Sequence, residues 1–129
     1  MLSKAELVLE GNTYALNSVS FEIGQDLDHF GRPSSMPKGG KIEIELNTVE
    51  DDVLFDWMVR TEKMLNGSIS LYEADNETRL KELKFENALC IAYTEVFEEA
   101  MEENLVTRLT ISAEKLSIGN IDLDNAWLK

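Results

Sequence analysis

A seventeen-residue connection, residues 24–40, separates two segments in which apolar and polar residues alternate. Alternation with a period of two predicts half-buried β-strands, and it is clearest over residues 41–46. The connection holds four of the seven glycines, both prolines and the only histidine. Connections inside a small domain are usually much shorter, and long ones tend to be functional arms or disordered. We therefore expect a β-rich fold from which residues 24–40, called the arm below, protrude.

The segment before the arm predicts an antiparallel pair of strands. Residues 4–10 and 13–23 alternate, and Gly11-Asn12 between them is typical of a β-hairpin. The apolar positions of the second strand change parity at Asn17-Ser18, placing Val19, Phe21 and Ile23 inward. A β-bulge at Asn17-Ser18 is the expected cause.

A second hairpin is predicted from residues 67–74 and 78–86, with Leu83 and Phe85 inward. Continued alternation would keep Leu89, Ile91 and Tyr93 inward. The opposite, outward face then carries Ala88, Cys90 and Ala92. A row of small apolar side chains on an acidic protein suits close approach of another surface.

The last strand, residues 105–118, changes parity near Glu114-Lys115, which predicts a second bulge. Residues 96–103 predict a short amphipathic turn with Phe97, Ala100 and Met101 inward. In the tail, Trp127 is expected to dock on its own domain or on a neighbour.

One helix is predicted after Thr48. Acidic residues at 50–52 suit a helix N-terminus, because the helix dipole favours negative charge there. Asn66-Gly67 is the expected stop. The apolar residues at helical spacing are Val53, Leu54, Trp57, Met58 and Leu65. These patterns predict one mainly β domain, residues 1–129: a compact β-barrel or two-sheet roll with one flanking α-helix and the protruding arm.

The charge balance limits the function classes. With 25 acidic and 12 basic residues, the chain has a formal net charge of −13, which argues against nucleic acid and anionic membranes as partners. One cysteine excludes an internal disulfide and a cysteine-based zinc site. The sequence start lacks the apolar core of a signal peptide, and no run is long enough to span a bilayer.

Residues with catalytic potential stand alone. His29 has no second histidine or nucleophile, and Cys90 lies mid-strand without a positive neighbour. The glutamates at 98, 99, 102 and 103 lack the spacing of a calcium loop. We therefore expect no catalytic residue, no metal and no cofactor.

The arm is the remaining candidate, either as a loose hairpin tip or as a docking element. Its prolines restrict the backbone, Phe30 and Met36 are apolar, and Arg32 offers positive charge to an acidic neighbouring copy. The predicted contact residues are Asp26, Asp28, Phe30, Arg32, Pro33, Ser34, Ser35, Met36 and Lys38.

Three segments resemble the TssD (Hcp) tube proteins of type VI secretion systems, in the branch found in Bacteroidota. They are Gly31-Arg32-Pro33-Ser34-Ser35 with Gly39-Gly40 and residues 41–46, then residues 83–95, then residues 109–120. Residues 36–38 and the glutamate-rich residues 98–103 depart from the family pattern.

The resemblance implies a β-barrel with one flanking helix that forms hexameric rings. The rings stack into a tube inside a contractile sheath, and contraction expels the tube to deliver effectors into a target cell. The arm then reaches the adjacent ring, whereas Ala88, Cys90 and Ala92 are expected between neighbours within a ring. Partners would be identical copies, paralogous tube subunits, and sheath, spike and effector proteins. The protein would be cytoplasmic when assembled and then secreted without a cleaved signal peptide. No catalysis is implied.

Three alternatives remain open from the residues. A phage-type tail-tube protein shares the same physical features. A small β-barrel that binds an apolar ligand predicts an internal cavity, and a hydrolase with acidic catalytic groups predicts turnover that depends on one carboxylate.

Overall fold

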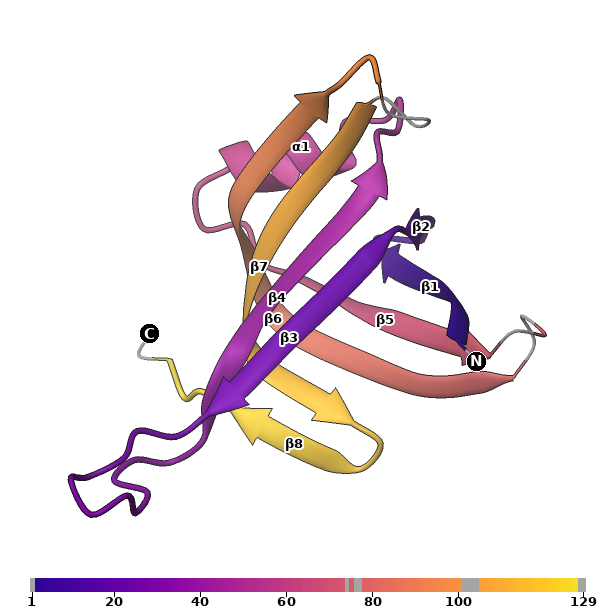
Figure 1. Cartoon of the computed structure of the whole chain (residues 1–129). Coiled ribbons are helices and arrows are strands. Elements are labelled where there is room, and N and C mark those ends of the chain that lie inside the picture. The colour runs from indigo at the N-terminus through magenta and orange to yellow at the C-terminus, as the bar shows by residue number, and fades with distance from the viewer. Residues whose placement is uncertain (1, 74, 76–77, 101–104, 128–129) are drawn as a thin grey trace.

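The computed structural model describes residues 2–73, 75, 78–100 and 105–127. Within them the chain is mainly β (Figure 1). The elements are β1 (Leu2–Leu9), β2 (Asn12–Leu16), β3 (Ser18–Gly24), β4 (Lys38–Asn47), α1 (Val53–Val59), β5 (Leu65–Glu73), β6 (Arg79–Phe97), β7 (Leu105–Ile118) and β8 (Ile121–Asp124). The prediction of a mainly β fold with one helix is confirmed.

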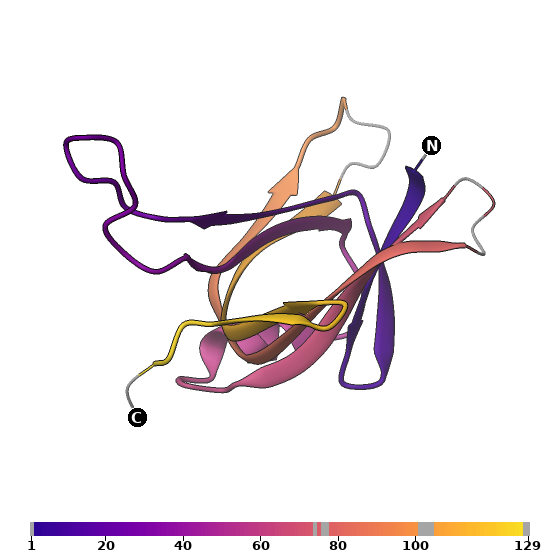
Figure 2. The same cartoon turned by 90° about the horizontal axis from the view of Figure 1, so that it is seen from below.

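The strands form one antiparallel sheet with the order β2-β1-β5-β6-β7-β4-β3, and β8 pairs with β7. The two edge strands, β2 and β3, follow each other in the chain. Between them, the backbone N–H of Asn17 donates a hydrogen bond to the carbonyl of Glu45 in β4, 2.7 Å away. The sheet therefore curls until its ends meet at this corner, giving a barrel-like shape (Figures 1 and 2).

The predicted bulge at Asn17-Ser18 is wrong. β2, which pairs with β1, ends at Leu16, and after Asn17 the chain starts β3, which pairs with β4. The change in apolar parity marks this exchange of partner. Because β3 is a sheet edge, Val19 is only partly buried, and Phe21 and Ile23 are exposed rather than inward.

The helix is shorter than the pattern predicted. α1 ends at Val59, and Leu65 lies in β5. Thr48 is not the cap, because its hydroxyl shares a 2.8 Å hydrogen bond with the hydroxyl of Thr107 in β7. The N-terminal backbone of the helix is instead held by Asp51, whose carboxylate accepts a bond from the Val53 N–H at 3.1 Å.

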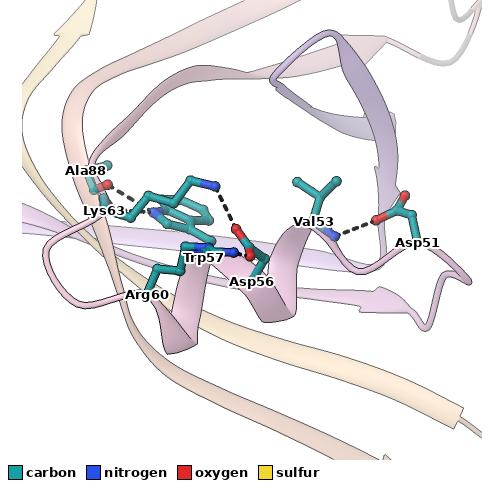
Figure 3. A network of polar contacts seen from close by, with 7 residues as sticks. All are labelled: Asp51, Val53, Asp56, Trp57, Arg60, Lys63 and Ala88. Carbon is teal, nitrogen blue, oxygen red and sulfur yellow. Dashed lines mark hydrogen bonds and ion pairs between the residues drawn. The ribbon is translucent and has the colours of Figure 1, made fainter.

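Trp57 fixes α1 to the sheet (Figure 3). Its side chain is buried, and its ring stacks at 6.5 Å from that of Phe85 in β6. On the helix surface, Asp56 contacts Lys63 at 2.6 Å and Arg60 at 2.7 Å. The hydrogen bond from Lys63, and to a smaller extent the one from Arg60, hold the pKa of Asp56 below its usual range.

In both β6 and β7 the alternation of buried and exposed residues shifts by one position, at Asn87 in β6 and at Glu114 opposite it in β7. We call this shift the change of face. On one side Phe85 pairs with Leu116, and on the other Ala88 pairs with Ala113, so the register is unchanged. All four side chains are buried. Asn87 has a φ of 52°, and its side-chain amide donates to Glu114 Oε1 at 2.9 Å.

The predicted change of parity near Glu114-Lys115 is therefore confirmed. The bulge predicted as its cause is wrong, because β7 has no extra residue relative to β6 at this point. β6 changes parity as well, which the sequence pattern did not indicate. Ile91 is exposed and Leu89 only half-buried, and both had been expected inward.

Phe97, expected inward, is 64% exposed at the end of β6, and Ala100 is exposed as well. The rest of the expected amphipathic turn, residues 101–103, lies outside the described residues. Trp127 is half-buried.

Candidate interaction site

The arm is an ordered hairpin that extends away from the sheet (Figures 1 and 2). Beyond β3 and β4, Leu27 and Pro33 form an isolated antiparallel bridge. The backbone N–H of Ser34 donates to the carbonyl of Asp26 at 2.7 Å, and that of Asp28 donates to the carbonyl of Arg32 at 2.8 Å. These bonds favour the preformed projection over the loose hairpin tip.

The tip is closed by Asp28. One of its carboxylate oxygens accepts bonds from the backbone N–H groups of Phe30 at 2.9 Å and Arg32 at 3.0 Å. The Gly31 N–H donates to the Asp28 carbonyl at 3.0 Å, in a turn where Gly31 has a φ of +83°. Aspartate commonly closes turns in this way, since its short side chain reaches backbone N–H groups two residues ahead.

Near the sheet, Asp26 connects the two sides of the arm. Its carboxylate contacts the Lys38 ammonium at 2.9 Å, and its backbone N–H donates to the Ser35 hydroxyl at 2.9 Å. The hydrogen bond and charge of Lys38 lower the pKa of Asp26. Arg32 similarly lies 3.4 Å from Asp28. Each acidic side chain of the arm therefore has a basic side chain beside it, and the arm is close to neutral on a chain of charge −13.

The arm exposes apolar side chains. Leu27 is 63% exposed, Phe30 73% and Met36 81%. The Arg32 guanidinium lies 5.3 Å from the centre of the Phe30 ring, and His29 packs beside the same ring at 4.6 Å. Leu27 was missed by sequence reasoning, although a single apolar residue between two aspartates was a usable signal. A nearly neutral, apolar projection is suited to contact with protein.

The second predicted surface does not form as expected. Ala88 and Cys90 point into the core, with 0% and 8% of their surface exposed, because β6 exchanges faces at Asn87. Ala92 is exposed after a further irregularity between Cys90 and Ala92. Burial raises the pKa of the Cys90 thiol to about 11. The outward orientation of Ala88 and Cys90 was wrong, and Ala92 alone remains available for contact.

The described part of the chain shows no group of three or more His, Cys, Asp or Glu side chains that could hold a metal ion. None of its helices has the length and apolar character needed to cross a membrane.

The barrel-like fold and the ordered apolar arm define a small subunit suited to contacts between protein chains. The family model described as hemolysin coregulated protein Hcp (TssD) matches residues 1–128. The chain therefore belongs to the TssD (Hcp) family.

Solved structures agree with this membership. Hcp1 from Flavobacterium johnsoniae is 35% identical, with a TM-score of 0.90, covering 95% of this chain and 100% of that chain. A mutant Hcp1 from E. coli EAEC 042 has 15% identity and a TM-score of 0.77, covering 96% and 99%. The sheath-tube complex of the extracellular contractile injection system PVC has 20% identity and a TM-score of 0.67, covering 91% and 88%. The last two likenesses concern the fold alone. No curated protein matches the sequence.

Proposed function

We propose that this chain is a structural subunit that forms hexameric rings, which stack into the inner tube of a type VI secretion apparatus. The tube is expelled to deliver effectors into target cells. The observation that carries the proposal is the likeness to Hcp1 from Flavobacterium johnsoniae, since 35% identity extends over 95% of this chain. Membership of the TssD (Hcp) family over residues 1–128 supports the role of tube subunit.

The arm is the proposed contact between stacked rings. Contacts between unlike surfaces of identical chains close into rings or continue into filaments, and a tube uses both arrangements. Each added copy brings a charge of −13, so stacking is opposed by repulsion that salt screens over roughly 8 to 10 Å. Because the ion pairs Asp26–Lys38 and Asp28–Arg32 balance the arm, its exposed apolar residues can approach an acidic copy with less repulsion.

The proposed partners are identical copies, paralogous tube subunits, and the sheath, spike and effector proteins. We place the protein in the cytoplasm while it is assembled and outside the cell after expulsion. The proposed role is structural rather than catalytic.

A ligand-binding barrel receives less support from the interior. The core is a continuous cluster of buried side chains that includes Trp57, Phe85, Leu9 and Ile69. The apolar hollow beside Ile69 and Leu83 has a volume of about 250 Å³, below the roughly 300–1,000 Å³ typical of ligand sites.

Electron microscopy of the purified full chain over a range of protein and salt concentrations tests the proposal. We expect six-fold rings at low concentration, and stacks or tubes as concentration or ionic strength rises. Analytical ultracentrifugation supplies the matching mass. A monomer under all of these conditions would overturn the proposal, and lipid that co-purifies with a monomer would favour a ligand-binding barrel.

A further inference from the structure

The side chain of Asn125 joins the C-terminal segment to the base of the arm. Its Oδ1 accepts a hydrogen bond from the Gly39 N–H at 3.3 Å, and its Nδ2 donates to the Gly39 carbonyl at 2.9 Å. The same Nδ2 donates to the carbonyl of Ala113 in β7 at 3.0 Å. One amide thus bridges the strand that leaves the arm and the strand beside it.

The backbone around Asn125 is fixed as well. Its N–H donates to the carbonyl of Glu114 at 2.8 Å, next to the point where β6 and β7 exchange faces. Immediately before it, β8 pairs with β7, with Leu123 opposite Leu116. Asn125 therefore extends from a hydrogen-bonded strand rather than from a free tail.

The base of the arm has no room for side chains at the contact. A Cβ on Gly40 would lie 2.3 Å from the carbonyl oxygen of Ala113 and 2.7 Å from Asn125 Nδ2, and the φ of Gly40 is +96°. A Cβ on Gly39 would lie 2.7 Å from the Ile23 side chain and 2.9 Å from that of Leu123. The glycine pair thus allows the C-terminal segment to lie directly against the backbone of the arm's base.

The turn after Asn125 is strained. Ala126 has a φ of 51°, a conformation that costs a residue with a Cβ free energy. Its N–H donates to Asp124 Oδ1 at 2.7 Å, which holds the turn closed. This turn leads the chain on to the half-buried Trp127.

We propose that residues 121–127 act as a latch that sets the direction of the arm, with Asn125 as its positioning residue. The arm is ordered within itself by Asp26 and Asp28, but those bonds do not fix its angle to the sheet. The contacts of Asn125 with Gly39 and Ala113 supply that constraint.

The consequence for assembly rests on the proposed function. A docking element held in its bound direction loses less conformational freedom on binding, so its contacts yield more affinity. The latch would therefore act on stacking between rings without touching the neighbouring ring.

The first experiment measures the latch in the full chain at a concentration below that at which rings form. In Asn125→Ala, we expect hydrogen exchange of the amides at residues 38–40 to rise roughly tenfold, since one hydrogen bond shifts an opening equilibrium by about that factor. Amides that pair β6 with β7 should keep their protection. Unchanged exchange at residues 38–40, or an equal rise throughout the sheet, would overturn the latch.

Arm direction is measured by electron spin resonance between nitroxide labels at His29→Cys and Lys84→Cys, in a Cys90→Ala background. We expect a broader distance distribution in Asn125→Ala than in the parent. Asn120→Ala, in the turn before β8, is the matched control and should retain the parent distribution. Equal widths in all three proteins would contradict a positioning role.

Asn125→Asp provides a second variant if the alanine variant does not fold. Its carboxylate retains an acceptor for the Gly39 N–H but, when ionised, has no donor for the carbonyls of Gly39 and Ala113. The same loosening at residues 38–40 is expected, and its absence would count against the latch. Since exchange and distances are measured on unassembled chains, a failure of the parent to form tubes would affect the proposed function alone.

Discussion

The indole Nε1 of Trp57 lies 3.1 Å from the carbonyl oxygen of Ala88, and it donates a hydrogen bond to that oxygen within the core. It also lies 3.1 Å from the carbonyl of Lys63. The bond ties a seven-residue helix to β6 at the first residue after the change of face. A helix this short has little stability of its own, so tertiary contacts hold it in place.

Trp57→Ala should lower the free energy of unfolding by about 3–5 kcal/mol, because it leaves a cavity beside Phe85. Trp57→Phe should cost about 1–3 kcal/mol, since the carbonyls lose their donor. Urea unfolding measures both. Phe55→Ala on the exposed side of the same helix is the control, with an expected loss of about 1 kcal/mol. Equal losses at both positions would contradict the anchoring role of Trp57.

The pH dependence of stability should contain a contribution from Asp56. Lys63 and Arg60 lower the pKa of this carboxyl in the folded chain, so its contribution is present above the unfolded-state pKa. It is lost as pH falls through the lowered folded-state pKa. Urea unfolding from neutral pH down to pH about 3 should show a shallower decline for Asp56→Asn than for the parent. Parallel curves would show that the ion pairs do not contribute.

Gly40→Ala should destabilise the protein by more than about 3 kcal/mol, because the new methyl group meets backbone atoms at a positive φ. Gly24→Ala is a matched control at the other side of the arm's base, where no atom lies within 4 Å of the added carbon. Thermal unfolding compares the two variants. A Gly40→Ala protein as stable as Gly24→Ala would show that the base can move aside.

Arg32→Glu should weaken stacking while leaving the folded subunit intact. The change places a carboxylate beside Asp28 and removes the cation over Phe30, yet the exposed arm contributes little to the core. We expect tubes to shorten or disappear in electron micrographs, with a change in unfolding free energy below about 0.5 kcal/mol. Lys84→Glu makes the same charge change outside the arm. Tubes of parental length in Arg32→Glu would remove the tip from the contact.

Cys90→Arg should prevent folding, since it buries a charge without a partner. In the parent protein, the Cys90 thiol should react slowly with disulfide reagents at neutral pH, because burial raises its pKa to about 11. Ala92→Arg should fold, as judged by circular dichroism, because Ala92 is exposed. A folded Cys90→Arg protein would contradict the buried position. Rings of unchanged mass in Ala92→Arg would place Ala92 outside the contact within a ring.

The strand pattern and the arm could be predicted because alternation and turn residues act locally. Residues 41–46 lie in β4, and the Gly-Pro-rich segment forms the protruding hairpin. The inward side of β6 could not be predicted in the same way. The buried positions of β6 shift at Asn87, whose positive φ is supported by hydrogen bonds with Asn66 and Glu114 from distant parts of the chain.

The extent of the helix also depended on distant contacts. Threonine is a common helix-capping residue, but the hydroxyl of Thr48 forms a hydrogen bond with that of Thr107 instead. Arg60 and Lys63 carry the positive charge that favours the C-terminal end of a longer helix, but both contact Asp56. Asn125 shows the same limit, because nothing in its sequence neighbourhood indicates contact with Gly39, 86 positions away.

The joint change of face at Asn87 and Glu114 has a consequence for how such a chain can vary over evolution. Removing one residue from β6 alone would leave β7 unmatched and turn Leu83 and Phe85 toward water, while the buried row after Asn87 stayed in place. A compensating loss in β7 would be needed at the same level of the sheet. In this subunit the spacing between buried residues is thus a property that the two strands share, and length should vary freely only outside their paired residues.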